Sequence, residues 1–267
     1  MQSEEVKEFG LVIIESLREN DKKTGTILHE ETIKYKKFIE NNLSSYLYTV
    51  NNRDEFFRIL TEIKNKIIND KFFSILHLEM HGFEDGVQLT SREIVKWYDL
   101  MPVFREINEL LSNLLVIMLG LCKGASIISY IDPSKRAPFR AIIGATRDLD
   151  EIELLIGCET FYDNYFFTFN PVQSLDLMNR EIDIQKPTFH LLTSEQCFDG
   201  IVDPDRDPVH FSKMVEDCTL IEQQTNVDFK DSSLEQIREY VDDKIRRTLL
   251  ELKKNKDYFL MKDLKRN

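Results

Sequence analysis

The sequence predicts an α/β fold of three layers (α/β/α), in which helices cover both faces of a mostly parallel central sheet. Short apolar runs alternate with stretches of helical periodicity along the first 192 residues, and this alternation is typical of parallel sheets with crossover helices. A polar segment with two prolines, 203–208, ends the pattern, and the residues beyond it show helical periodicity alone. We therefore expect one domain over residues 1–202 and a helical C-terminal extension over residues 203–267.

Each expected strand is a short run of apolar and β-branched residues, and each expected helix repeats apolar residues every three or four positions. Asp54 precedes such a repeat and is a candidate N-cap. Ser232 and Glu235 match a capping box ahead of the last helix. In chain order we expect strands over 11–14, 46–50, 72–80, 114–121, 139–144 and 188–192, and helices over 29–41, from 54, within 91–111, from 123, over 151–167 and from 232.

Composition limits the kind of partner. The chain has 267 residues and a net charge of -12, so its average surface repels phosphate backbones and we expect no nucleic-acid partner. The longest apolar run, 110–121, contains Ser112 and Asn113 and is too short to cross a bilayer. The first residues lack the basic region of a secretory signal. These features predict a soluble, cytoplasmic protein that does not bind membranes.

Four cysteines, at positions 122, 158, 197 and 218, stand at unrelated spacings without a C-x-x-C pair. This is the pattern of neither a disulfide framework nor a zinc site. We expect reduced thiols, no metal and no other cofactor.

Two reactive side chains follow successive expected strands and are flanked by glycine. His81 and Gly82 close one strand, and Cys122 lies between Gly120 and Gly124 after the next. The carboxyl ends of parallel strands meet at one edge of a sheet, where ligands bind. A thiolate and an imidazole placed there can perform nucleophilic acyl transfer, and the backbone amides of Gly82 and Cys122 are candidate oxyanion donors.

A second architecture fits the same residues. In it, Gly120-x-Cys122-x-Gly124 is the nucleophile elbow of an α/β-hydrolase that acts on small esters or lactones, and the catalytic histidine is His190 or His210. That topology needs a further strand and helix before the elbow, and residues 91–111 contain no clear strand. We therefore favour His81 as the base.

The string His77-Leu-Glu-Met-His81-Gly82 resembles the H-x-x-x-H-G motif of CHAT-type peptidases, the caspase-like branch of the clan that includes metacaspases and separase. The resemblance covers about residues 11–192. Three further segments are similar to that family: Cys122-Lys-Gly-Ala-Ser126, the strand 141–146 and Phe161-Tyr162.

The resemblance implies a caspase-like fold and a cysteine endopeptidase with a Cys-His dyad of Cys122 and His81 and an oxyanion hole that includes Gly82. It further implies that Ala145 and Thr146 border the primary specificity pocket. Many relatives carry Asp or Gln two positions before the nucleophile, where it helps to select substrate. Here that position is Gly120, so we expect no strong selection for Arg, Lys or Asp.

His77 shares strand parity with His81, and we expect it to support the site by hydrogen bonding in the pocket floor. Similar bacterial peptidases cut a protein partner and activate a toxin or a defence effector, for example in antiviral defence. We therefore expect a protein substrate as the partner. The C-terminal helices, with their basic residues, offer a surface for a regulatory partner. The remaining alternative is a caspase-like interaction module without activity, which the unusual Lys123 after the nucleophile would suit.

Overall fold

The computed structural model describes residues 8–39, 43–206, 208–230 and 232–264. They form a mixed α/β structure with a mostly parallel central sheet, which confirms the expected class at this level. The strands are β1 (Glu8–Ser16), β2 (Leu43–Thr49), β3 (Phe72–Phe83), β4 (Gly86–Gln88), β5 (Ile94–Lys96), β6 (Val116–Gly120), β7 (Ala141–Ala145) and β8 (Phe189–Thr193). The helices are α1 (Thr24–Ile27), η1 (Leu28–Ile33), α2 (Lys34–Ile39), α3 (Arg53–Asp70), α4 (Trp97–Leu110), η2 (Gly124–Tyr130), α5 (Glu151–Thr168), α6 (Pro171–Ile182), α7 (Ser194–Val202), α8 (Pro208–Thr225), η3 (Val227–Phe229), α9 (Leu234–Lys254) and α10 (Lys256–Phe259).

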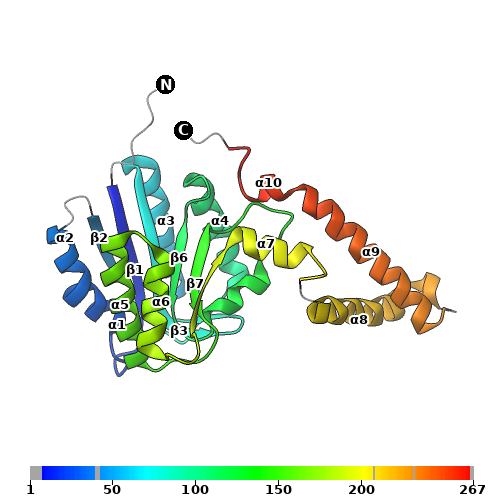
Figure 1. Cartoon of the computed structure of the whole chain (residues 1–267), viewed down its shortest axis with the longest axis horizontal. Helices are drawn as coiled ribbons and strands as arrows, with labels where there is room; N and C mark the ends of the chain where they lie inside the picture. Colours follow the sequence, from blue (N-terminus) through cyan, green and yellow to red (C-terminus); the bar gives the residue numbers. More distant parts are fainter. Residues whose placement is uncertain (1–7, 40–42, 207, 231, 265–267) are drawn as a thin grey trace. The chain divides into compact units, whose positions relative to one another are not determined.

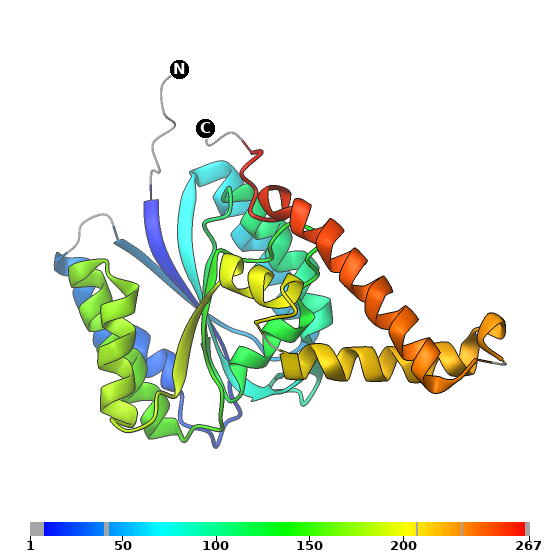
Figure 2. The ribbon, with the colours of Figure 1, turned by 45° about the vertical axis from the view of Figure 1, so that its right-hand side comes forward.

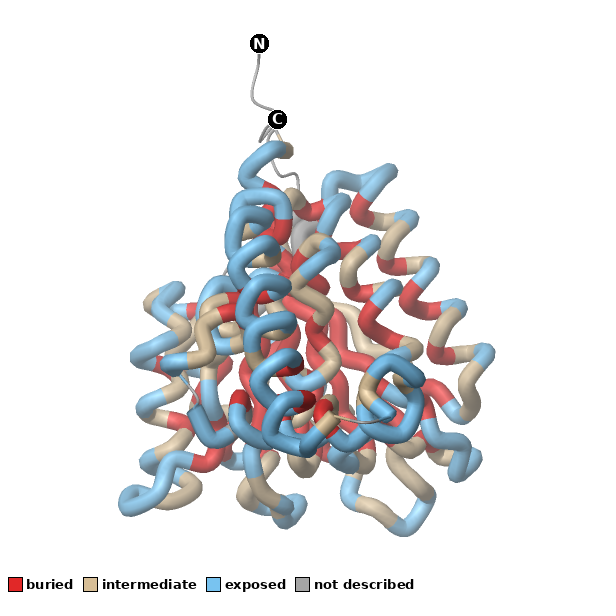
Figure 3. The backbone as a smooth tube through the Cα atoms, turned by 90° about the vertical axis from the view of Figure 1, so that its right-hand side faces the viewer, coloured by how far each residue is buried: buried red, intermediate tan, exposed pale blue. Residues whose placement is uncertain are grey.

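The main sheet has the strand order β2-β1-β3-β6-β7-β8 (Figure 1). The first five of these strands are parallel, and β8 runs antiparallel to β7. Central parallel strands are covered on both faces and consist of unbroken apolar runs. In β1, for example, residues 11–14 have no exposed surface, and the central strands are buried along their length in Figure 3.

Helices lie on both faces of the sheet (Figures 1 and 2). On one face, α5, α6 and η1 form an apolar core with alternate residues of β1, β3, β6 and β7. On the other face, α3 packs against β3 and α4. The N-cap of α3 is Asn52, whose side chain accepts a hydrogen bond from the Glu55 amide at 3.0 Å. The expected cap, Asp54, lies inside the first turn of the helix.

Several local predictions were wrong. The segment 91–111 begins with strand β5, which pairs with β4 in a hairpin, and becomes helical only at Trp97. The helix expected from Lys123 is the short 3₁₀ helix η2, and Lys123 itself has a left-handed φ of 54°. The capping box of α9 is formed by Ser233 and Gln236, one position later than expected. Helix α6 was not expected.

The stretch expected as one helix over 29–41 is divided into η1, a π-helix, and α2, and its last two residues lie outside the described ranges. None of the described helices combines the length and the apolar character that a membrane span requires.

The chain divides into two compact units. One consists of Met1–Ile131, Ala137–Ser194 and Leu264–Asn267, and the other of Asp132–Arg136 and Glu195–Asp263. The second unit therefore begins at Glu195, eight residues before the boundary expected at 203. Within it, α8 and α9 pack through an apolar seam of Phe211, Val215, Ile237, Val241 and Leu249.

Candidate active site

His81 stands near the end of β3, the strand between β1 and β6. Strand β3 pairs with β6 only as far as Glu79, opposite Gly120, so His81 extends beyond the end of this pairing. Its side chain remains 39% exposed. Because side chains alternate along a strand, His77, Glu79 and His81 point to the same face of the sheet.

Cys122 follows the end of β6 by two residues and is partly buried. Its sulfur accepts a hydrogen bond from the Leu149 amide at 3.3 Å, in the loop after β7. The next amide, of Lys123, donates to the carbonyl of Arg147 in the same loop at 3.2 Å. The loop after β7 therefore holds the thiol in place.

His81 and Cys122 line one cavity of about 90 Å³ at the carboxyl edge of the sheet. The rest of its wall comes from the loop after β1 with the start of α1, from β3 and the loop after β6, and from the loop after β7 with the first turn of α5, all in the first unit. The two residues predicted to react together therefore share a cavity. The other lining residues are Leu17, Asp21, Lys22, Thr24, Met80, Leu121, Leu149, Asp150, Glu151 and Leu154.

Asp21, which the sequence reasoning missed, binds His81. Its Oδ2 lies 2.8 Å from His81 Nε2 and also accepts the Arg18 amide at 2.8 Å. Burial acts to raise the pKa of Asp21, but the hydrogen bonds from Arg18 and His81 outweigh it and the pKa is lowered. An ionised carboxylate only accepts hydrogen bonds, so Nε2 carries the hydrogen and Nδ1 is the nitrogen left to exchange a proton with the thiol. The sequence contained one indication of this contact. Asp21 follows β1, which is parallel to β3 and next to it in the sheet, so the residues after both strands lie at the same edge.

Gly82 brings two backbone segments of the site together. A Cβ atom at this position would lie 2.1 Å from the carbonyl oxygen of Cys122 and 2.5 Å from Leu121 Cδ1. Such distances exclude any side chain, so glycine allows the β3 backbone to touch the nucleophile loop. The two amides expected to bind an oxyanion thus belong to backbone segments in direct contact.

His77 lies in the protein interior and is absent from the cavity lining. It is fully buried, with Nδ1 2.9 Å from the Tyr162 hydroxyl and Nε2 2.5 Å from Glu79 Oε2. The second oxygen of Glu79 accepts the hydroxyl of Thr24, a cavity residue. His77 is therefore linked to the cavity only through Glu79 and Thr24.

The other predicted substrate-binding residues do not line the cavity. Gly120 is covered by Glu79 and His77, and Ala145 is buried in the core beneath α5. Thr146 is exposed, and its amide donates to the Thr188 carbonyl at 3.2 Å. Leu149, four residues beyond Ala145, supplies this part of the wall instead.

Of the two alternative histidines, His190 is not found at the thiol. His190 is exposed on β8, opposite Gly144, and does not line the Cys122 cavity. The side chain of His210 lies outside the described residues. Between His81 and β6, the strand that leads to Cys122, the structure adds only the β4–β5 hairpin and α4, with no further strand in the main sheet.

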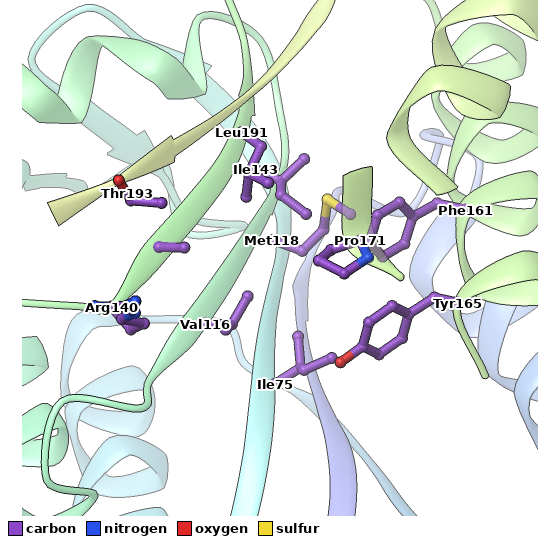
Figure 4. Close-up of a pocket in the computed structure, with 11 residues that line it drawn as sticks. Ile75, Val116, Met118, Arg140, Ile143, Phe161, Tyr165, Pro171, Leu191 and Thr193 are labelled. Atoms are coloured by element: carbon purple, nitrogen blue, oxygen red, sulfur yellow. The ribbon is translucent and has the colours of Figure 1, made fainter. Parts of the chain in front are cut away.

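A second cavity, of about 220 Å³, opens near the amino ends of the parallel strands (Figure 4). Its walls are apolar side chains of the sheet and of α5, with Arg140, Tyr165 and Thr193 as polar members. No cysteine, histidine or carboxylate lines it. It therefore lacks the candidate nucleophile and base, Cys122 and His81, which line the smaller cavity.

Within the described part of the chain, no three His, Cys, Asp or Glu side chains are grouped so as to hold a metal ion. A comparison with protein-family models finds no matching family, and a comparison with curated protein sequences finds no match.

Proposed function

We propose that this protein is a cysteine endopeptidase of the caspase-like class, with Cys122 as nucleophile and His81 as acid and base. One arrangement carries this proposal: the two side chains line a single cavity at the carboxyl edge of the sheet, and Asp21 holds the imidazole there. A nucleophile, a base and a group that orients the base are the three parts of an acyl-transfer site.

In the proposed reaction, the Cys122 proton passes to His81 and the sulfur attacks the carbonyl carbon of the scissile peptide bond. The tetrahedral intermediate collapses as the C–N bond breaks, and the departing amine takes the proton from His81. Water then attacks the thioester after giving a proton to His81. The C–S bond breaks, the thiol regains that proton, and a carboxylic acid is released.

Asp21 acts in this scheme as a positioning residue. It fixes the ring orientation and the tautomer of His81, and its negative charge favours the imidazolium that forms after proton transfer. The amides of Gly82 and Cys122 are the proposed donors to the developing oxyanion.

The proposed substrate is a protein, and the proposed setting is the activation of a toxin or defence effector in the cytoplasm. The motif from His77 to Gly82 supports the caspase-like assignment, because its last histidine and glycine meet the cysteine loop. The function of the helical unit in this setting is proposed to be the docking of a regulatory partner.

The test is cleavage of a peptide library by the full chain and by Cys122→Ala and His81→Ala. We expect cleavage by the wild type and loss of at least about a hundredfold in each variant. Cys218→Ala, a change of a thiol on α8, is the matched control and should cut normally. Equal cleavage by all four proteins would reject the dyad. A further variant, His190→Ala, tests the α/β-hydrolase alternative, which would be favoured if activity were lost in His190→Ala and kept in His81→Ala.

A further inference from the structure

We infer that the cavity beside Cys122 is a primary specificity pocket for a medium-sized aliphatic side chain, so that the enzyme cuts after Leu or Met. This inference rests on the proposed function, and it concerns the substrate residue that precedes the cut. Three observations support it: the inner wall is neutral, the nearby carboxylates already accept hydrogen bonds from other residues, and the cavity is small.

The inner wall of the pocket is neutral. Its three buried members are Thr24, Met80 and Leu121, each no more than 3% exposed. Three more leucines, which are partly buried, complete the apolar lining: Leu17, Leu149 and Leu154. The charged lining residues Lys22, Asp150 and Glu151 are exposed and lie toward solvent. A side chain that enters the pocket therefore exchanges water for hydrocarbon, which favours an apolar group.

A cationic side chain would find no available carboxylate at the inner end. Glu79 is bound to His77 and Thr24, and the neighbouring Glu15 is bound through both oxygens to the amide and hydroxyl of Thr26. Asp21 is engaged by His81. A buried ammonium or guanidinium without a partner is strongly disfavoured.

An anionic side chain meets the opposite problem. Three carboxylates line the cavity, from Asp21, Asp150 and Glu151, against a single exposed cation, Lys22. A substrate aspartate would add a fourth negative charge beside them, and like charges repel. The lining therefore disfavours cleavage after Asp as well.

The volume separates aliphatic from aromatic side chains. The cavity holds about 90 Å³, whereas a cavity of about 150 Å³ is known to accept benzene in an engineered protein core. The smaller space therefore suits the flexible side chains of Leu and Met better than a rigid six-membered ring. Leu154, on α5, is one of the apolar residues that line this space.

The test compares peptides that differ only in the residue before the cut, with Leu, Met, Phe, Arg or Asp at that place, and uses the full chain. We expect kcat/KM for Leu and Met to exceed the other three by at least about tenfold, which is the usual discrimination of an apolar pocket. A preference for Arg, Asp or Phe, or equal rates for all, would overturn the inference.

A variant and a probe make the test independent of a single result. Leu154→Ala should raise the rate for Phe relative to Leu by about tenfold, and Ile156→Ala, an exposed position of α5 outside the lining, should leave the ratio unchanged. Peptidyl chloromethyl ketones with Leu or Arg at the same place alkylate an active cysteine in one step. Faster Cys122 labelling by the Arg ketone rejects the pocket assignment but retains the peptidase, and no labelling by either ketone rejects both.

Discussion

Gly120 of β6 lies against Glu79 of β3, and a Cβ atom at position 120 would stand 2.2 Å from Glu79 Oε2 and 2.6 Å from His77 Nε2. A side chain at 120 and the buried His77–Glu79 pair therefore exclude each other. The acidic group beneath the cavity is supplied by β3, and β6 leaves room for it. This arrangement explains why the position two residues before Cys122 is glycine.

The first prediction concerns this contact. Gly120→Ala should destabilise the first unit by about 1–3 kcal/mol, because a methyl group would be forced against a buried, hydrogen-bonded pair. The measurement is urea unfolding followed by the fluorescence of Trp97, the single tryptophan, which is fully buried in that unit. Gly200→Ala, a change in the second unit where a Cβ meets nothing within 4 Å, is the control and should leave the Trp97 transition unchanged. An unchanged midpoint for Gly120→Ala would show that the pair can move aside.

The second prediction separates positioning from stability at Gly82. In Gly82→Ala the new methyl group would collide with the Cys122 carbonyl and displace Cys122. A misplacement of about 1 Å can reduce a rate by about a hundredfold, so we expect peptidase activity to fall by about that factor or more. Activity and Trp97 unfolding should be measured on the same preparation. Full activity would contradict the proposed role of this backbone contact.

The third prediction is the effect of Asp21→Asn on catalysis. The amide presents a donor as well as an acceptor to His81 and so permits the wrong tautomer. We expect kcat to fall by at least about tenfold with little change in KM, and Asp21→Glu to restore part of the loss. Asp85→Asn, a change at an exposed turn, is the control. Equal kcat in Asp21→Asn and wild type would remove Asp21 from the mechanism.

The same carboxylate makes a prediction about stability and pH. Because the folded-state pKa of Asp21 lies below its ordinary value of 3.8, its stabilising effect is fully present above that value and is lost as pH falls through the folded-state pKa. The stability difference between wild type and Asp21→Asn should therefore shrink as the pH falls below about 4 and vanish in stronger acid. A difference that persists in strong acid, where the Asp21 carboxyl is protonated, would contradict a lowered pKa for this group.

The fifth prediction concerns the thiols. Burial, with smaller effects of Glu79 and Glu159, raises the pKa of Cys158 well above its ordinary value, and burial raises the pKa of Cys197 to about 11. At pH 8 only about one Cys197 in a thousand would be a thiolate, and thiolates are the reactive form. Iodoacetamide followed by mass mapping should therefore label Cys122 and leave Cys158 and Cys197 intact until urea is added. Labelling of Cys158 in the native protein would contradict its burial.

The sheet was largely predictable because its central strands are buried on both faces and consist of unbroken apolar runs. The hairpin was not, since β4 and β5 are three residues each and pair with each other and with the end of β3. Such short segments carry too little periodicity to be recognised. The caps of α3 and α9 were displaced by one or two residues, where several polar residues stand side by side and backbone geometry selects among them.

By itself the sequence determined that strands alternate with helices, and that His81 and Cys122 each follow the end of an apolar run. It did so because burial of apolar side chains is a local property with a readable period. Only the tertiary structure decided that Asp21 binds His81, that Glu79 occupies the space above Gly120, and that Leu149 rather than Ala145 lines the cavity. These contacts join residues from different strands and loops, and their partners depend on register and on the path of each loop, which local patterns do not specify.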